Sequence, residues 1–335
     1  MPGVFEDKEL IACDRSGGSY DGNVYVAWTR FWSTQIYCVR STNGGTSFQT
    51  PLRVSDSGGV QWPVPCVGAD GTLYIGWVDL GDPSIKLDRS LDGGQTFGSD
   101  QVLTSPYTGA VTLNGGIDSF SFPALDCDLS GGAHYGRLYV AYMDNLHGDF
   151  DIFLRRSDNE GASWTAPLRL NDDVPGNGRD QFHPWLTVAA DGSISVIFYD
   201  RRLDPGNYLM DLYFTQSTDG GLTWSPNARV TTVSSDPNAG LRAGLIGEYI
   251  GLASSGAGRV HPVWTDMCEG NQDTYTAIIG GTTAAPPPAA GLAGLRLAAA
   301  APNPFREETR LSSGIYLLRV ASGGEQGAAR VLLLR

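Results

Sequence analysis

The sequence has no long apolar run, and it lacks the targeting and metal-binding patterns that would narrow its class at once. The alanine-rich stretch near 284–301 is interrupted by prolines and Arg296, so no window qualifies as a transmembrane helix. The first eight residues lack the basic region and apolar core of a signal peptide. We therefore expect no insertion into a membrane.

Positive charge is also scarce. Lysine and arginine total 23 against 36 acidic residues, the only lysines are Lys8 and Lys86, and the formal net charge is −13. Nucleic acids and anionic membranes attract basic surfaces. The charge balance argues against nucleic acid as a partner and is compatible with neutral sugars or cations.

The five cysteines cannot all pair with one another, and none lies in a C-x-x-C motif. In the internal repeat described below, Cys13 and Cys127 fall where other copies have valine, and Cys38 falls where others have leucine or phenylalanine. A free thiol packs at such positions as a small hydrophobe. We expect buried thiols rather than disulfides.

What is abundant is glycine, with 44 residues, and a repeated octet. Each octet begins with serine, has glycine at its fifth place and ends in an aromatic residue, and its four copies are residues 41–48, 90–97, 157–164 and 217–224. The third residue is Asp or Asn, which accepts backbone N–H bonds in a turn, and glycine permits positive φ. We predict tight turns between strands, closed by Asn43, Asp92, Asn159 and Asp219 and covered by Phe48, Phe97, Trp164 and Trp224.

Each octet lies inside a longer repeat of predicted strands, and the second strands, largely apolar on both faces, align at 24–30, 73–79, 138–144, 194–200 and 260–266. The octets resemble the Asp-box (BNR) repeat of sialidase-like β-propellers. The resemblance implies an all-β, sialidase-like β-propeller of four-stranded antiparallel blades, with five units that start near residues 7, 61, 120, 181 and 247. We expect a six-blade architecture with one N-terminal blade outside this sequence, and a five-blade ring is the alternative.

The composition predicts three regions: the propeller at 1–280, a linker rich in Ala, Pro and Gly at 281–301, and a short β remnant at 302–335. The remnant has Pro-Asn-Pro-Phe at 302–305, Gly-x-Tyr at 314–316 and Arg-Val-Leu-Leu-Leu-Arg at 330–335. It resembles the C-terminal sorting domain of type IX secretion, without that domain's middle strands. The resemblance implies contact with the secretion machinery and a secreted or cell-surface location in a Gram-negative bacterium. A chance amphipathic tail is the alternative.

Strand alternation places the ends of the second strands and the starts of the first strands on one face, opposite the octet turns. The polar residues expected at this rim are Arg30, Asp79, Asp144, Asp200, Arg201, Asp266, Gln181, His183, Glu248 and Tyr249. A polar ring that includes aromatic residues is one way to build a carbohydrate or cation site. Each aspartate is equally placed to cap a turn, so both roles stay open.

The resemblance also implies a sialidase reading, in which three arginines bind the substrate carboxylate, an aspartic acid acts as acid/base, and a tyrosine assisted by a glutamate is the nucleophile. The Arg-Ile-Pro motif of that family does not occur here, and only Arg30, Arg201 and Arg242 lie near the rim. Glu248 and Tyr249 are adjacent, so strand alternation directs them to opposite faces.

We therefore expect an exported propeller that binds a glycan or another extracellular polymer without catalysis. An exo-sialidase or other glycoside hydrolase that uses the same rim is the first alternative, and a structural repeat module is the second. No catalytic residue or metal ligand is assigned. No cofactor is expected, although Asp14, Asp126 and Asp128 lie in Asp/Gly turns of a kind that occasionally binds Ca²⁺.

Overall fold

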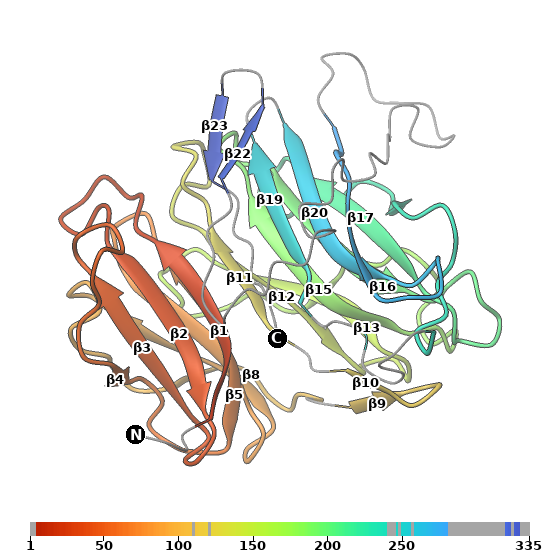
Figure 1. The fold of residues 1–335 in the computed structure, drawn as a ribbon, viewed down its shortest axis with the longest axis horizontal. Helices are drawn as coiled ribbons and strands as arrows, with labels where there is room; N and C mark the ends of the chain where they lie inside the picture. The colour runs from red at the N-terminus through yellow and green to blue at the C-terminus, as the bar shows by residue number, and fades with distance from the viewer. Residues whose placement is uncertain are drawn as a thin grey trace, which may run out of the picture.

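The computed structural model describes residues 5–108, 111–119, 122–239, 246, 249–255, 258–280, 319–322 and 325–328. Every regular element in this part of the chain is a β-strand, and all strand pairs are antiparallel. No helix suited to crossing a membrane is found among these residues. The predicted all-β fold is confirmed (Figure 1).

Five sheets follow one another along the chain as propeller blades, and the first four have four strands each. Their strands are β1(Glu6–Cys13), β2(Val24–Arg30), β3(Gln35–Ser41) and β4(Leu52–Arg53); β5(Val60–Val67), β6(Leu73–Asp79), β7(Ser84–Ser90) and β8(Gln101–Thr104); β11(Ala124–Cys127), β12(Leu138–Asp144), β13(Asp151–Ser157) and β14(Leu168–Arg169); and β15(Gln181–Val188), β16(Ile194–Asp200), β17(Asp211–Ser217) and β18(Ala228–Arg229). The fifth blade has three strands within the described residues, namely β19(Gly251–Ser255), β20(Arg259–Asp266) and β21(Asp273–Thr276).

Two further hairpins lie outside the blades. β9(Val111–Leu113) pairs with β10(Ile117–Ser119) between the second and third blades, and β22(Arg319–Ser322) pairs with β23(Glu325–Ala328) in the expected C-terminal remnant. The predicted linker at 281–301 lies outside the described residues.

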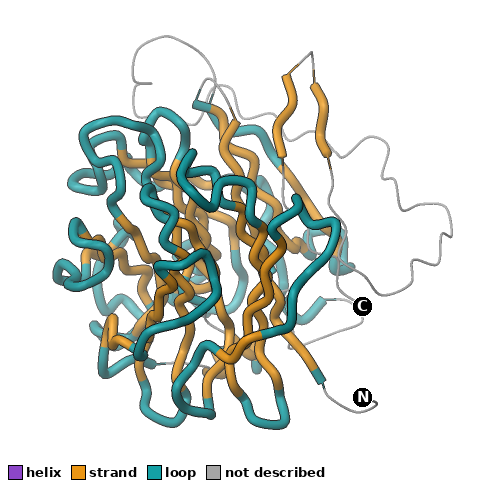
Figure 2. Tube along the Cα trace, turned by 90° about the vertical axis from the view of Figure 1, so that its left-hand side faces the viewer, coloured by secondary structure: helices purple, strands orange, loops and turns teal. Residues whose placement is uncertain are grey.

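The first strand of each blade lies innermost. β1 packs on β5, β5 on β11, β11 on β15 and β15 on β19, so the first strands follow one another around a common axis (Figure 1). Figure 2 shows the strands running beside one another, with loops at their ends. In the described part of the chain, no comparably extensive strand contact joins the fifth blade to the first. The first strands are therefore the elements that bring side chains from different blades together.

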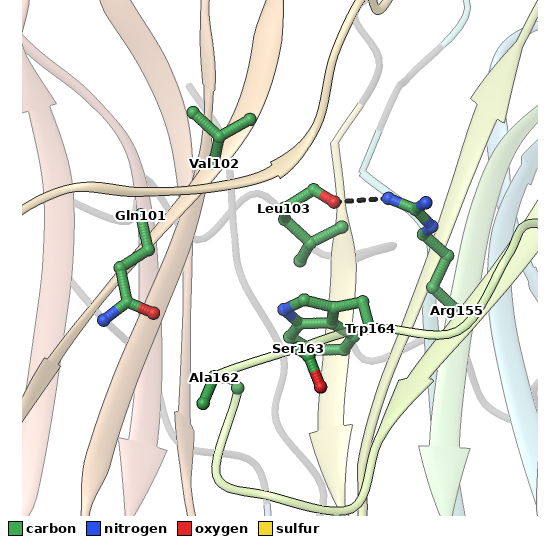
Figure 3. Close-up of a pocket in the computed structure, with 8 residues that line it drawn as sticks. Gln101, Val102, Leu103, Arg155, Ala162, Ser163 and Trp164 are labelled. Atoms are coloured by element: carbon green, nitrogen blue, oxygen red, sulfur yellow. Dashed lines mark hydrogen bonds between the residues drawn. The ribbon is translucent and has the colours of Figure 1, made fainter.

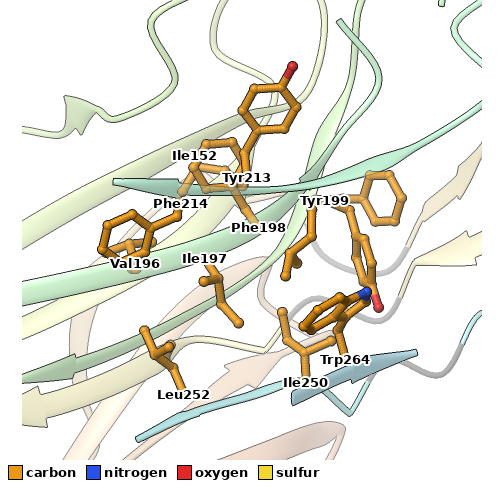
Figure 4. Close-up of a cluster of buried hydrophobic side chains, with 14 of the residues drawn as sticks. Ile152, Val196, Ile197, Phe198, Tyr199, Tyr213, Phe214, Ile250, Leu252 and Trp264 are labelled. Atoms are coloured by element: carbon orange, nitrogen blue, oxygen red, sulfur yellow. The ribbon is translucent and has the colours of Figure 1, made fainter. Parts of the chain in front are cut away.

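The core fills the space between neighbouring sheets. All seven residues of β6, of β12 and of β16 are buried, as predicted for strands covered on both faces. Figure 4 shows Ile197 of β16 beside Ile250 and Leu252 near the fifth blade, with Phe198 and Tyr213 close by. The rings of Phe198 and Tyr213 stack at 6.3 Å. Each large side chain buried this way stabilises the fold by about 1.5–3 kcal/mol.

The first blade is covered less completely. Four of the seven side chains of β2 are buried and three are half-buried, because one face of this sheet has no neighbouring sheet in the described structure. Cys38 and Cys127 are buried free thiols, as predicted, and burial raises the pKa of each to about 12. Cys13, at the end of β1, is exposed, so the expectation of a buried thiol there was wrong.

Candidate functional site

The octet turns are built as their sequence dictates. In the fourth blade, Asp219 Oδ1 accepts the backbone N–H groups of Leu222 (3.0 Å) and Thr223 (2.9 Å), and Ser217 Oγ accepts the N–H of Gly221 (2.9 Å). The hydrogen bonds from Thr223 hold the pKa of Asp219 well below its usual range. Asn43, Asp92 and Asn159 each accept a backbone N–H from the octet's seventh residue at 2.9 Å.

These turns also join neighbouring blades. In the first three blades an arginine directly before the octet serine donates to a backbone carbonyl in the next blade's octet. The pairs are Arg40 Nη1 to Gly93 O (3.0 Å), Arg89 Nη1 to Glu160 O (3.0 Å) and Arg156 Nη1 to Gly221 O (2.7 Å). The fourth blade has Gln216 at this position, and the fifth unit has no octet to receive such a bond. The octet face is thus an inter-blade joint.

The second-strand aspartates lie at the opposite end from the octets, because Asp79 pairs with Ser84 in β7 whereas Leu73 pairs with Ser90. All four accept hydrogen bonds from the turns that follow, Asp200 Oδ1 from Arg202 N (2.7 Å) and the other three in the same way. Asp79 Oδ1 accepts from Gly81 N (2.9 Å), Asp144 Oδ1 from Asn145 N (2.9 Å), and Asp266 Oδ1 from Cys268 N (2.9 Å). All three carboxylates are buried.

Asp79 additionally binds the ammonium of Lys86 at 2.6 Å, and Asp266 accepts hydrogen bonds from Ser235 and from Trp264 Nε1 (3.0 Å). Asp79 and Asp266 therefore cap turns, as their sequence positions allow. Asp79 also forms an ion pair, and Asp266 also accepts hydrogen bonds from side chains.

Asp200 belongs to a buried polar network rather than to an open rim. Its Oδ2 pairs with Arg202 Nη2 (2.7 Å), and its Oδ1 accepts from Gln181 Nε2 (3.3 Å). Arg202 also forms an ion pair with Asp172, in the loop that leaves the third blade. Burial raises the pKa of Asp200, while the Arg202 guanidinium opposes that rise. Gln181 and Asp200 thus help to join the third and fourth blades.

The two rim arginines that the structure describes have different environments. Arg30 pairs with Glu6 (2.8 Å), and its guanidinium lies 4.0 Å from the centre of the Tyr37 ring. Arg201 is fully buried, 5.2 Å from the centre of the Phe182 ring, and its Nη1 donates to Asn207 O at 3.1 Å.

Arg201 carries a charge that is only partly neutralised. Within the described residues its Nε and Nη2 have no hydrogen-bond partner, and the nearest carboxylate, of Asp180, is 3.9 Å from Nη1. Burial lowers the pKa of this guanidinium, because desolvation disfavours the charged form.

The residues that do converge come from the starts of the first strands. Lys8, Trp62 and His183 each sit in a β-bulge of their strand and have positive φ values of 61°, 64° and 47°. Such values are uncommon for residues other than glycine, and strained backbone of this kind is concentrated at functional sites. A bulge redirects a side chain, and here it occurs at the same place in three blades.

Lys8 and Trp62, together with Phe122 and Tyr249, which each lie two residues before the first strand of their blade, form what we call the axial cluster. The Lys8 ammonium lies 4.4 Å from the Tyr249 ring centre and 5.4 Å from that of Phe122. Phe122 is in ring contact with Trp62 (6.2 Å) and Tyr249 (5.8 Å). Because these residues belong to the first, second, third and fifth blades, they can meet only near the axis.

Lys8, Trp62 and Phe122 are buried, and Tyr249 is half-buried. His183 occupies the corresponding place in the fourth blade, and its ring contacts Phe182 (5.2 Å) in the same blade. The cluster is thus a packed aromatic floor with one ammonium group, and Tyr249 is its partly accessible member.

Of the predicted rim residues, the structure brings Tyr249 into this cluster. It places Arg30, Asp79, Asp144, Asp200, Asp266 and Gln181 in local pairs and caps, and Glu248 and Arg242 lie outside the described residues. Lys8 and Phe122 were missed. The signal was their alignment with Trp62 and His183 at the starts of the repeats. Among the described residues, no group of His, Cys, Asp and Glu is arranged to hold a metal ion.

These features define the chain as a β-propeller with a closed aromatic centre. No protein-family model and no curated protein matches it. A solved protein of unknown function from Dyadobacter fermentans DSM 18053 is similar at 14% identity and a TM-score of 0.51, over 84% of each chain.

Two sialidase structures are similar as well. A Hadza microbial sialidase aligns at 15% identity and a TM-score of 0.51, over 82% of this chain and 56% of its own. A leech intramolecular trans-sialidase aligns at 11% identity and a TM-score of 0.54, over 82% of this chain and 57% of its own. This chain thus spans less than two thirds of either sialidase. At these identities the likeness shows a sialidase-like propeller fold.

Proposed function

We propose that the protein is an exported β-propeller that binds a glycan or another extracellular polymer over the axial cluster, without catalysing its cleavage. The observation that carries this proposal is the meeting of Lys8, Phe122 and Tyr249, from three blades that are not neighbours, on one face of the fold. Ligand sites are commonly built where several elements contribute a few polar groups to an aromatic surface.

The chemistry of the cluster suits a saccharide. A tyrosine ring offers an apolar face to a sugar ring, and Tyr249 is half-buried. The Lys8 ammonium lies against the Tyr249 and Phe122 rings, so the cluster also carries a positive charge. Trp62 and Phe122 beneath them fix both groups before a ligand arrives, which lowers the entropic cost of binding.

The four second-strand aspartates support the non-catalytic form of the proposal. Most glycoside hydrolases need two carboxyl groups flanking the scissile bond. Asp79, Asp144, Asp200 and Asp266 are buried and bound to turn N–H groups or cations. Their burial and existing partners make these four carboxylates poor candidates for exchanging a proton with a ligand.

One observation favours the hydrolase alternative. Arg201 has two nitrogens without hydrogen bonds inside the described structure, and a carboxylate is the partner that a guanidinium binds best. Its side chain is fully buried, however, so a ligand would reach it only after the residues around it move. We therefore retain an exo-sialidase or related hydrolase as the second candidate.

Export is part of the proposal and rests on the sequence. The motifs in 302–335 support a remnant of a type IX sorting domain, and the octets support true Asp-boxes. Removing 302–335 is expected to leave the protein inside a type IX-secreting cell. Fractionation of the periplasm and the medium tests this, and unchanged export of the shortened protein would contradict it.

The binding proposal is tested on a glycan array with labelled protein, followed by titration of the best glycan. Tyr249→Ala and Lys8→Met are expected to weaken binding by at least about tenfold, a loss that corresponds to one or two contacts. Tyr135→Ala is the matched control, because Tyr135 is an exposed tyrosine in a turn of the third blade away from the axis.

Equal binding by the axial variants and the control would overturn the proposed site, and the absence of any bound glycan would overturn the function. Thermal melts of each variant separate lost contacts from lost folding. Release of sialic acid from a fluorogenic sialoside that disappears in Tyr249→Phe would establish the hydrolase instead.

A further inference from the structure

A second candidate site lies away from the axis, between the second and third blades. A cavity of about 570 Å³ opens between β8 and the octet turn of the third blade (Figure 3). Its walls include Gln101, Val102, Leu103, Arg155, Ser163 and Trp164. Its volume is within the range of small-molecule sites, roughly 300–1,000 Å³. We call it the interblade crevice.

Among the described residues that line the crevice, Arg155 is the one with a charged side chain. Its Nη1 donates to the carbonyl of Leu103, which fixes the guanidinium at the wall (Figure 3). Its Nε is buried without a hydrogen-bond partner in the described part of the chain. A guanidinium that is anchored and partly desolvated attracts an anion more strongly than one in open water.

This cation is specific to the third blade. The residue two places before the octet serine is Arg155 here, but Val39, Asp88 and Thr215 in the other three octet-bearing blades. The carbonyl-binding arginine of the inter-blade joint is the neighbouring Arg156, so Arg155 is not needed for that bond. In a protein of net charge −13, a crevice lined by one arginine and no carboxylate stands apart electrostatically.

The remaining wall groups suit a sugar ring. Figure 3 shows the indole of Trp164 between Arg155 and Gln101, at the centre of the crevice. Trp164 is half-buried, and Gln101 and Ser163 are exposed. Ser163 Oγ accepts a bond from Asn159 (2.8 Å) and keeps its own proton for donation. An aromatic face, an amide, a hydroxyl and a fixed guanidinium match the apolar face, the hydroxyls and a carboxylate of one acidic sugar residue.

We infer that the interblade crevice is a second saccharide subsite, which takes a sugar residue bearing a carboxylate. The inference rests on the proposed function only in its ligand class, because the crevice and the axial cluster share no residue. It adds to that function a preference for negatively charged sugars. Arg155 can bind a carboxylate, whereas the axial cluster contains no arginine.

The test is calorimetric titration of the whole protein with D-galacturonate and D-galactose, which differ in the carboxylate. The wild-type protein is expected to bind galacturonate at least about tenfold more tightly than galactose, as one charge-assisted contact produces. Arg155→Gln should abolish this preference, and Trp164→Phe should weaken the binding of both sugars. Arg53→Gln and Trp224→Phe are matched controls, because Arg53 is an exposed arginine of the first blade and Trp224 is the half-buried tryptophan at the equivalent place in the fourth blade's octet.

Equal affinity of the wild-type protein for the two sugars would overturn the inference, as would an undiminished preference in Arg155→Gln. Failure of galacturonate to bind would do the same. If Tyr249→Ala abolishes galacturonate binding while Arg155→Gln and Trp164→Phe leave it intact, the crevice is refuted and the axial site is supported. If no glycan binds the protein at all, the proposed function fails as well.

Discussion

The arginines that reach from one octet-bearing blade to the next should determine how firmly the blades hold together, and Arg156→Gln tests this. Arg156 Nη1 lies 2.7 Å from the Gly221 carbonyl oxygen, so the bond is short and one partner is charged. Glutamine is the residue that the fourth blade has at this place, so the change introduces a side chain that the repeat already tolerates.

The size of the effect follows from that contact. A hydrogen bond to a charged group contributes about 1.5–3 kcal/mol to stability. Arg156 also has a buried Nε without a partner in the described structure, and removing that unsatisfied group offsets part of the loss. We expect Arg156→Gln to lower the free energy of unfolding by about 1–2 kcal/mol. For a domain of this size class, about 2–4 °C in Tm per kcal/mol is typical.

The assay is a thermal melt combined with amide hydrogen exchange of the octet at 217–224. Exchange should rise in that octet more than in the octet at 90–97, because only the former loses its arginine. Arg53→Gln removes an exposed arginine and serves as the control for lost charge. A Tm for Arg156→Gln equal to that of the control, with unchanged exchange at 217–224, would refute the reasoning that these arginines bind the blades together.

Two further predictions concern buried aspartates. Asp200→Asn is expected to lower the free energy of unfolding by about 3 kcal/mol, since it breaks the buried pair with Arg202 (2.7 Å), and to leave glycan affinity unchanged. A thermal melt with a parallel glycan titration checks this. Lost affinity at an unchanged Tm would instead show that Asp200 contacts the ligand. Burial raises the pKa of Asp88 from 3.8 to about 6, so the native state binds a proton more tightly than the unfolded state, and this group stabilises the fold progressively as the pH falls from about 6 toward 4. Melts at pH 7 and pH 4.5 should show that Asp88→Asn loses this part of the acid stabilisation, and an identical pH dependence in both proteins would contradict the assignment.

The blades could be predicted from the sequence because the interactions that define them are local. Within residues 217–224, serine, aspartate and glycine satisfy one another's hydrogen bonds, so the turn forms wherever that octet occurs. The second strands, such as β16, are apolar on both faces, and only a fold that sandwiches each sheet between two others buries them fully. The all-β class and the positions of the five blades follow from these two patterns.

The candidate site depended on contacts that no local pattern encodes. Asp79 and Asp200 stand at equivalent strand ends, yet Asp79 pairs with Lys86 of the next strand, whereas Asp200 pairs with Arg202, whose guanidinium also binds Asp172, 30 positions earlier in the chain. The inter-blade bond of Arg156 likewise joins residues 65 positions apart. Whether a polar side chain faces a ligand or a neighbour is decided by which charges the folded chain places beside it.

The axial cluster likewise depends on tertiary contacts and not on a local sequence pattern. A β-bulge at Lys8 requires a register shift against the paired strand, and a lysine in the left-handed region gives no compositional sign of it as glycine would. Its contacts with Phe122 and Tyr249 exist only because the blades curve round one axis. Hydrogen bonds between residues a few positions apart make the repeating unit predictable from the sequence. The tertiary structure decided which side chains meet, because residues from blades that are not neighbours come together only at the centre of the fold.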